Sequence, residues 1–129
     1  MGVEKLVGSQ TTPMENIYRE QIIPGKLKVD VIFETERVMA FHHTKPYWER
    51  HVVIIPKAHI DSLSTYNNNP QLNHDFFEAI RIVTRMFENQ YGGCRISSNI
   101  GNYQTSKHLH WYVHQGKRLV EESEDPVHK

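Results

Sequence analysis

The chain has 129 residues, which is enough for one domain with a single hydrophobic core and too short for two such domains. Basic and acidic residues balance at 15 each, so no net field would steer the protein toward nucleic acid or an anionic membrane. Hydrophobic residues make up 38% of the chain, an ordinary globular composition that does not suggest disorder, and the nine histidines are the compositional outlier.

Cys94 is the only cysteine, so an internal disulfide and an all-cysteine metal site are excluded. A reducing cytoplasm is the simplest location for such a chain. The first eight residues contain neither the apolar core of a signal peptide nor a run long enough to span a bilayer. We therefore expect a cytoplasmic protein that contacts neither membranes nor nucleic acid.

The sequence divides into an arm, one domain and a tail. Residues 1–13 lack a sustained apolar period and are interpreted as a flexible N-terminal arm. Residues 14–116 contain the structural signals and form the predicted domain. Residues 117–129 are charged and are interpreted as a C-terminal tail.

The first half of the domain predicts a short helix and three strands. Residues 15–23 are compatible with two helical turns, which Pro24-Gly25 would end. Residues 28–34 and 37–41 predict two strands joined as a hairpin. Residues 51–57 form an apolar run and predict a buried strand at the centre of the sheet.

The strongest element is a helix over residues 71–91, with Asn69 and Pro70 at its start and glycines 92–93 at its end. Its apolar residues recur at threes and fours, which predicts one buried stripe with polar residues facing outward. The stripe consists of Leu72, Phe76, Phe77, Ile80, Val83, Met86 and Phe87. The outward set consists of His74, Asp75, Glu78, Arg81, Arg85 and Glu88.

Two more strands are predicted after the helix, at residues 94–99 and around residues 107–114. The order of hairpin, strand, long helix and two strands predicts an α+β domain. We expect a mainly antiparallel sheet of about five strands, one long helix and a short N-terminal helix.

Polar and apolar residues alternate through residues 107–114, so a strand here would carry a chemical face backed by a packing face. The chemical face is His108, His110, Tyr112 and His114, and the packing face is Leu109, Trp111 and Val113. Three interpretations remain open for the imidazoles. One is a phosphorus-directed nucleophile with helper histidines, because neutral imidazole can attack without first losing a proton. The others are a histidine metal site and a solvated strand face without function.

Several motifs occur together with this strand. Phe41-His42 precedes a turn, and His51 begins a run that continues to Pro56-Lys57-Ala58-His59. Asn99 precedes Gln104-Thr105-Ser106-Lys107-His108-Leu109-His110. In this order the motifs resemble the histidine triad (HIT) family of nucleotide-binding proteins, whose signature is His-x-His-x-His followed by two apolar residues. The resemblance runs from about Ile17 to Gly116.

The resemblance implies hydrolysis or transfer of nucleoside monophosphates from nucleotidyl substrates through a covalent nucleotidyl-histidine. It also implies a homodimer, and chemistry that needs no cofactor or metal. His110 matches the middle histidine, which would be the nucleophile on the α-phosphorus. His108 matches the first histidine, which would orient the nucleophile. His51 resembles an upstream histidine of the same hydrogen-bonded chain.

The resemblance further implies a nucleotide site. Gln104 and Thr105 match a polar pair that contacts phosphate oxygens or the leaving group, and Asn99 matches a residue of the phosphate and ribose site. The residues implied for the base and ribose are Ile17, Tyr18, Phe41, His42, His43 and Val53.

Two positions depart from the family pattern. Tyr112 occupies the place of the third histidine, and its phenol can donate a hydrogen bond to phosphate but cannot carry positive charge. His43 stands where the family usually has an acidic residue that holds the ribose hydroxyls. His114, two residues beyond Tyr112, could replace the lost histidine through a register change. The alternatives are a nucleotide-binding module without chemistry, and a metalloprotein that uses His108 and His110 with His114 or His51.

Overall fold

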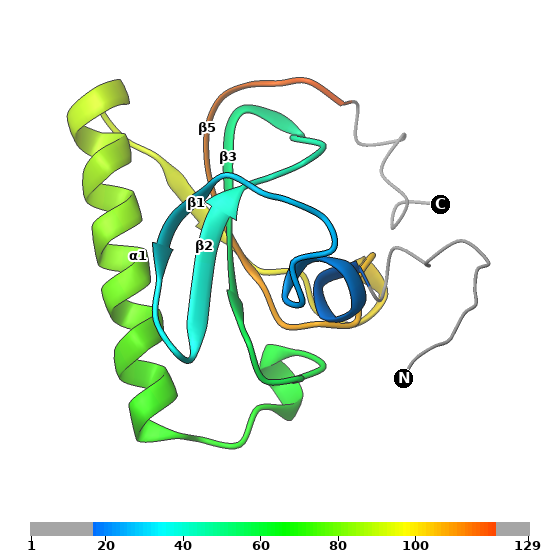
Figure 1. Cartoon of the computed structure of the whole chain (residues 1–129). Helices are drawn as coiled ribbons and strands as arrows, with labels where there is room; N and C mark the ends of the chain where they lie inside the picture. The colour runs from blue at the N-terminus through cyan, green and yellow to red at the C-terminus, as the bar shows by residue number, and fades with distance from the viewer. Residues whose placement is uncertain (1–16, 121–129) are drawn as a thin grey trace.

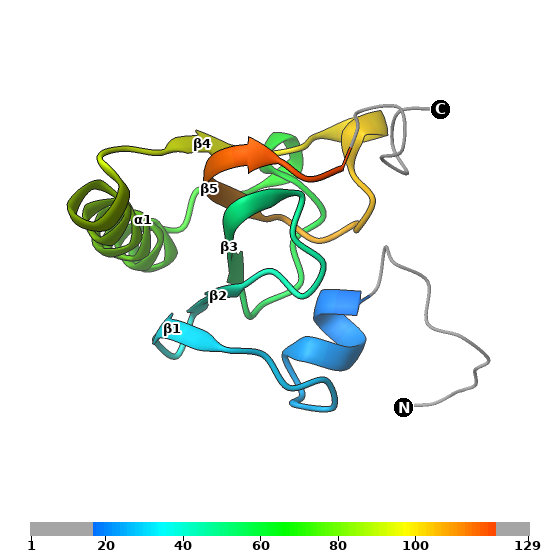
Figure 2. The ribbon, with the colours of Figure 1, turned by 90° about the horizontal axis from the view of Figure 1, so that it is seen from above.

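The computed structural model describes residues 17–120, so the arm expected at residues 1–13 lies outside the described residues. Its centre is a five-stranded antiparallel sheet in the order β1-β2-β3-β5-β4, and helix α1 covers one face (Figure 1). The short helix η2 lies on the other side of the sheet (Figure 2). The predicted α+β architecture is thereby confirmed. The elements are η2 (Tyr18–Ile22), β1 (Val31–Glu34), β2 (Val38–His42), β3 (Trp48–Pro56), η3 (Leu63–Thr65), α1 (Pro70–Tyr91), β4 (Arg95–Ser97), η4 (Gly101–Tyr103) and β5 (Trp111–Arg118).

The two faces of the sheet carry separate hydrophobic layers. Val52 and Ile54 of β3 face α1, whereas Val53 and Ile55 face η2, and all four side chains are fully buried. Because both faces are covered, β3 shows the continuous apolar run from which a central strand was predicted. Within the described residues, no helix is long and apolar enough to cross a bilayer.

Helix α1 begins with the expected cap. The Oδ1 atom of Asn69 accepts a hydrogen bond from the amide of Leu72 at 3.1 Å, and Gly92 ends the helix with a φ of 88°. The predicted buried stripe is wrong at Phe77, which is 72% exposed, and the predicted outward set is wrong at Asp75, which is buried. The stripe of α1 that packs against the sheet therefore excludes Phe77 and is narrower than the stripe predicted from the apolar residues.

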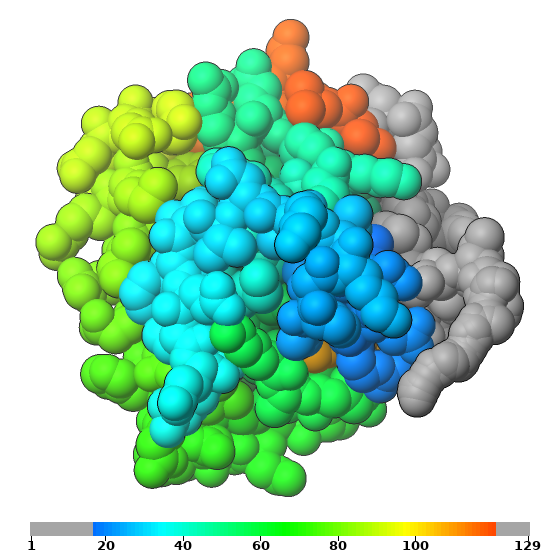
Figure 3. Space-filling view, in the orientation of Figure 1, coloured from blue at the N-terminus to red at the C-terminus, as the bar shows by residue number. Residues whose placement is uncertain are grey.

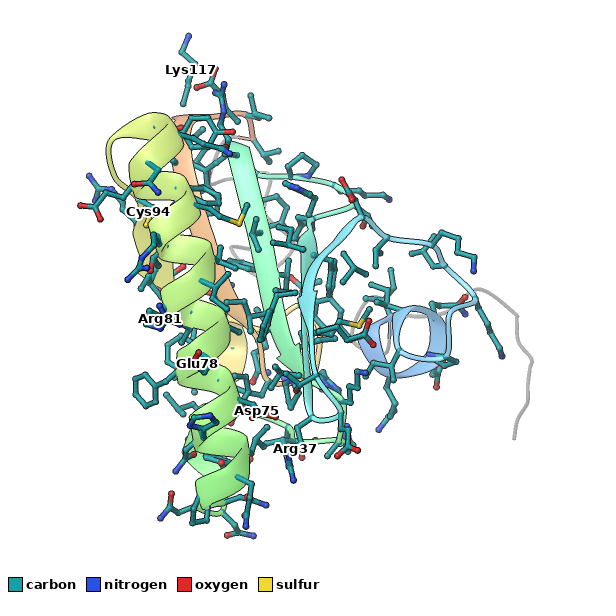
Figure 4. The ribbon with its side chains drawn as sticks, turned by 60° about the vertical axis from the view of Figure 1, so that its left-hand side comes forward. Arg37, Asp75, Glu78, Arg81, Cys94 and Lys117 are labelled. Carbon is teal, nitrogen blue, oxygen red and sulfur yellow. The ribbon has the colours of Figure 1, made fainter. Side chains whose placement is uncertain are left out.

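Asp75 is buried because it faces the turn between β1 and β2. Its Oδ2 atom accepts a hydrogen bond from Oγ1 of Thr35 at 2.8 Å and lies 3.5 Å from Nη1 of Arg37 (Figure 4). Both partners lie in that turn. The carboxylate thus ties α1 to the hairpin through charge-assisted hydrogen bonding.

The strand predicted around the histidine motif was wrong at its start, because β5 begins only at Trp111. The residues just before Trp111 are held by hydrogen bonds from other loops and not by pairing with a neighbouring strand. The amide of Leu109 donates to the carbonyl of Ile60 at 2.7 Å, and Oγ of Ser98 donates to the carbonyl of His110 at 2.6 Å. The histidine motif is therefore fixed by two neighbouring loops before it enters the sheet.

The alternation of faces through this segment is nevertheless present. Leu109 and Val113 belong to the layer under α1, and Tyr112 belongs to the layer on the η2 face. His108 and His110 are each only 1% exposed, so the interpretation as a solvated strand face was wrong. In the space-filling view, η2 and the green loop lie side by side with one small orange area between them, and a larger orange to red area is visible at the top (Figure 3).

Candidate functional site

A narrow pocket lies on the η2 face of the sheet beside the histidine motif, and the empty space in it and over its mouth, open solvent included, is about 400 Å³. Its lining consists of Ile17, Tyr18, Ile22, Phe41, His43, Thr44, Tyr47, Thr105, Ser106 and Tyr112. No lysine, arginine or carboxylate is among them. The pocket therefore offers apolar surface and neutral hydrogen-bonding groups, which suits a flat ring with a polar extension.

His110 adjoins this pocket, with its ring centroid 4.8 Å from that of Tyr112 and 5.7 Å from that of Tyr18. Its Nδ1–H group donates to the main-chain oxygen of His108 at 2.9 Å. This bond leaves the lone pair on Nε2, which is buried and has no hydrogen-bond partner among the described residues. Such a nitrogen can act as a nucleophile without first losing a proton.

His108 is oriented in the opposite sense. Its Nε2–H group donates to the main-chain oxygen of Pro56 at 2.8 Å, and its buried Nδ1 atom lacks a partner among the described residues. The ring of His59 lies 5.6 Å away, and Nη1 of Arg19 lies 3.0 Å from Nε2 of His59. Oδ1 of Asp61 also lies 2.9 Å from Nε2 of His59.

His51 lies on β3, on the far side of Tyr112 from His110. Its Nδ1 atom accepts a hydrogen bond from the amide of Tyr47 at 3.0 Å, so its proton is on Nε2, which is buried without a partner among the described residues. Its ring stacks on His43 at 4.4 Å and meets Tyr112 edge-on at 4.4 Å. Tyr112 thus has ring contacts with both His51 and His110.

Burial keeps these imidazoles uncharged. Desolvation lowers the pKa of His51 to about 2, with a further contribution from His43. Desolvation also lowers the pKa of His43 to about 4 and that of His108 to about 4, although the bond to Pro56 opposes the shift at His108. The pKa of His110 is lowered mainly by burial. Near neutral pH the site presents lone pairs and N–H donors, and no imidazolium.

Of the two loop residues predicted to contact phosphate, only Thr105 faces the pocket. Thr105 lines the pocket. The side-chain amide of Gln104 is used in holding the loop: Nε2 donates to Asp61 O at 2.7 Å and Ser106 O at 3.1 Å, and Oε1 accepts from the Gly101 amide at 3.2 Å. Gln104 therefore shapes the loop that carries Thr105 rather than facing the pocket.

Four residues predicted for the base and ribose line the pocket, namely Ile17, Tyr18, Phe41 and His43. Val53 is fully buried in the layer behind them. Neither His42 nor Asn99 lines the pocket. His42 is exposed, with Nε2 3.8 Å from an oxygen of Asp30, because it alternates with Phe41 along β2. Asn99 is half-buried just after β4.

Four lining residues were missed by sequence reasoning: Ile22, Thr44, Tyr47 and Ser106. Two of them had a usable signal. Ser106 stands inside the polar run before His108, and Tyr47 is one of two adjacent aromatics in a connection that is otherwise polar. Among residues 17–120, no group of three or more histidine, cysteine or acidic side chains is arranged to hold a metal ion.

Known proteins share this fold over most of the chain. The model of the HIT domain matches residues 25–119, which is most of the chain. The chain belongs to the HIT family. The match includes all of β5 and ends at Leu119.

HIT relatives match over nearly their whole length. A HIT-like protein of Chlamydia muridarum is 31% identical over 121 residues, covering 92% of this chain and 91% of the relative. A HIT-like protein of Azospirillum brasilense is 30% identical over 116 residues, covering 86% of this chain and 93% of the relative. The structure of a HIT family hydrolase from Clostridium thermocellum is 31% identical with a TM-score of 0.67, covering 79% of this chain and 91% of that one.

Proposed function

We propose that this HIT protein is a nucleotidyl hydrolase or transferase that acts on the α-phosphorus of a nucleotidyl substrate through a covalent intermediate on His110. The observation that supports the proposal is the tautomer of His110. Its Nδ1 proton is held by the carbonyl of His108 at 2.9 Å, so the lone pair of the buried Nε2 atom is available for attack. The hydrolase neighbour from Clostridium thermocellum supports the same reaction class.

The reaction has two balanced steps. In the first, Nε2 of His110 forms a bond to phosphorus, and the bond to the leaving group breaks with its electron pair, which a proton then neutralises. In the second, water attacks phosphorus and the N–P bond breaks, which releases the nucleoside monophosphate and restores His110. Suitable substrates are a nucleoside phosphoramidate, a dinucleoside polyphosphate or an adenylylated small molecule. No metal or other cofactor takes part in the proposed steps.

The proposal gives roles to the side chains that line the pocket. Ile17 and Phe41 contact the base, and Thr105 and Ser106 provide hydroxyls near the phosphate. Tyr112 stands at the position of the third histidine and donates a neutral hydrogen bond to a phosphoryl oxygen. His108 and His51 complete the surroundings of the nucleophile. His43 provides one acceptor for a ribose hydroxyl where a carboxylate would provide two.

Brief incubation with adenosine 5′-phosphoramidate, followed by quenching in an alkaline denaturant that preserves the acid-labile N–P bond, tests the proposal. We expect intact-protein mass spectrometry to show the mass of one adenylyl group, mapped to His110 in the wild type and missing from His110→Ala. Turnover without an adduct, at an undiminished rate in His110→Ala, would contradict it.

A binding module without chemistry is the second candidate function. The observation that favours it is the 1% exposure of His110 beneath Tyr18, which would keep phosphorus away from Nε2 if η2 did not move. Calorimetry with a purine nucleoside monophosphate, combined with product assays, separates the two functions. Binding without product from any of the three substrate classes would favour the module.

The protein is proposed to act as a homodimer through β4 and α1. β4 is the edge of the sheet and pairs only with β5 among the described strands. Ile96 on this strand is 46% exposed and Phe77 on α1 is 72% exposed. An unpaired edge with exposed apolar side chains is suited to pairing with a second copy.

A further inference from the structure

His43 lines the pocket and is also held by the loop that follows it. The amide of Lys45 donates a hydrogen bond to Nδ1 of His43 at 2.9 Å. The amide of His43 itself donates to the carbonyl of His51 at 2.8 Å, and the two rings stack with centroids 4.4 Å apart and planes 20° from parallel. Three contacts therefore fix the ring before any ligand binds.

The bond from Lys45 decides which nitrogen of His43 carries the proton. Because a main-chain amide can only donate, Nδ1 must hold a lone pair, and the proton of the neutral ring is then on Nε2. Burial, and then the neighbouring His110, lower the pKa of His43 to about 4, which keeps the ring neutral near neutral pH. Nε2 makes no hydrogen bond within residues 17–120, so its N–H group remains for a ligand.

A neutral ring in this state has no acceptor left. Nδ1 is its single acceptor atom and the loop occupies it, so the acceptor role given to His43 in the proposed function is replaced by a donor role. A carboxylate at this place would accept from two ribose hydroxyls and would need their protons. The N–H group of His43 needs an oxygen lone pair instead, which an ether or ester oxygen has as well as a hydroxyl.

The position of His43 suits the sugar of a bound nucleotide. Tyr112 contacts the rings of both His110 and His43, at 4.8 Å and 5.7 Å, so His43 lies one side chain away from the proposed nucleophile. The apolar side chains of the lining take the base, which leaves the polar end of the pocket for the sugar. Thr44, which follows His43 and also lines the pocket, is exposed, so this end is open to solvent.

We propose that His43 is a specificity-determining residue whose Nε2–H group selects nucleotidyl substrates by an acceptor on the sugar, so that substrates with an ether or ester at the 2′ or 3′ oxygen are turned over. The inference rests on the proposed function and names a substrate class within it. A substituent on either oxygen extends past Thr44 into solvent and does not enter the buried part of the pocket.

Three substrates that differ only in the sugar test the inference. Adenosine 5′-phosphoramidate has both sugar oxygens with their protons, its 2′,3′-di-O-methyl derivative keeps the oxygens as acceptors, and its 2′,3′-dideoxy derivative has neither. We expect the wild-type kcat/KM for the di-O-methyl substrate to be within about threefold of the parent value, and that for the dideoxy substrate to be about tenfold lower or more. A di-O-methyl substrate as poor as the dideoxy substrate would overturn the inference.

Variants of His43 should change this pattern in two different ways. His43→Phe keeps a stacked ring without the N–H group, so the parent and dideoxy substrates should become equal within about threefold. His43→Asp provides two acceptors, so the di-O-methyl substrate should become about tenfold poorer than the parent. His74→Phe, at an exposed position of α1, is the control and should keep the wild-type pattern. The wild-type pattern in a folded His43→Phe would contradict the role of the N–H group.

A measurement without turnover separates this inference from the proposed function. In ¹⁵N NMR near neutral pH, His43 should carry its proton on Nε2, and 2′,3′-di-O-methyl adenosine 5′-monophosphate should shift that nitrogen signal. A proton on Nδ1, or a bound nucleotide that leaves the signal in place, would overturn the inference even in an active enzyme. The expected tautomer and shift in a protein that never forms the His110 adduct would confirm the donor and contradict the proposed function.

Discussion

The Nδ1 atom of His110 lies 2.9 Å from the main-chain oxygen of His108, so a residue two positions earlier sets the tautomer of the candidate nucleophile. No second side chain is needed to hold the proton on Nδ1. The relationship explains how a buried imidazole can be ready for attack in a pocket without an acidic residue.

The first prediction separates the two histidines of the motif. His110→Ala should lower turnover by about a thousandfold or more, because no other nitrogen has a free lone pair at that position. His108→Ala should retain more activity, because it removes an orienting side chain while leaving the main-chain carbonyl that holds the Nδ1 proton. Single-turnover kinetics measure both losses, with His74→Ala on the exposed side of α1 as control. Equal losses in both variants would argue against these assigned roles.

The second prediction concerns pH and stability. The pKa values of His51 and His108 are about 2 and about 4 in the folded protein, below the unfolded value of 6.5. Between these values the unfolded chain binds more protons, so the free energy of unfolding should fall as the pH decreases below 6.5. The slope is up to about 1.4 kcal/mol per pH unit for each buried group. Urea denaturation from about pH 7 to about pH 5 measures it.

The control for this slope is His51→Phe, which removes one of the titrating groups and should flatten the dependence on pH. A stability that stays constant over the same range would contradict burial of neutral imidazoles in the site.

The third prediction compares two glycines with positive φ. At Gly116, with φ of 94°, an added Cβ would lie 2.5 Å from Oε1 of Glu49, whereas at Gly92, with φ of 88°, it would meet nothing within 4 Å. The same Glu49 oxygen accepts a hydrogen bond from the amide of Lys117 at 2.7 Å and cannot move away freely. Gly116→Ala should lose about 2–3 kcal/mol of stability and Gly92→Ala about 1 kcal/mol. Equal losses in thermal denaturation would show that only backbone strain matters.

The fourth prediction tests the carboxylate that ties α1 to the hairpin. Asp75→Ala should cost about 2 kcal/mol, because Thr35 and Arg37 lose a buried acceptor. Glu78→Ala, which removes an exposed ion pair with Arg81 (Figure 4), is the control and should change stability little. Chemical denaturation measures both, and activity should be unchanged because neither residue approaches the pocket.

The fifth prediction concerns assembly. Ile96→Lys should convert the proposed dimer into a monomer, because it places a charge on the exposed edge strand. Size-exclusion chromatography with light scattering measures the mass. Leu119→Lys, at a residue that is 56% exposed and lies beyond β5, serves as the control. A monomeric wild type would refute the interface directly.

The elements of the fold were predictable where local chemistry determined them. The cap at Asn69, the central run of β3 and the alternation through Leu109, Tyr112 and Val113 all follow from residue type and spacing. The face of Asp75 was not predictable, because its burial depends on Thr35 and Arg37, which reach it only after the hairpin folds onto α1.

The candidate site was likewise predictable only where residue type and spacing determine it. The histidine motif predicted which residues would carry the chemistry, but the tautomers depend on main-chain carbonyls at Pro56 and His108 that periodicity does not reveal. Gln104 had the right residue type for phosphate, yet its amide is used in the loop. Tertiary hydrogen bonding decided its role, and no local pattern reports that.

The position of β5 in the sheet has a consequence for biosynthesis. β5 is the last strand among residues 17–120, yet it lies between β3 and β4. Until β5 leaves the ribosome, no strand joins β3 to β4, and the exposed edge of β3 can pair with other chains. A nascent or C-terminally truncated chain that lacks β5 therefore lacks both a continuous sheet and the Tyr112 side of the pocket.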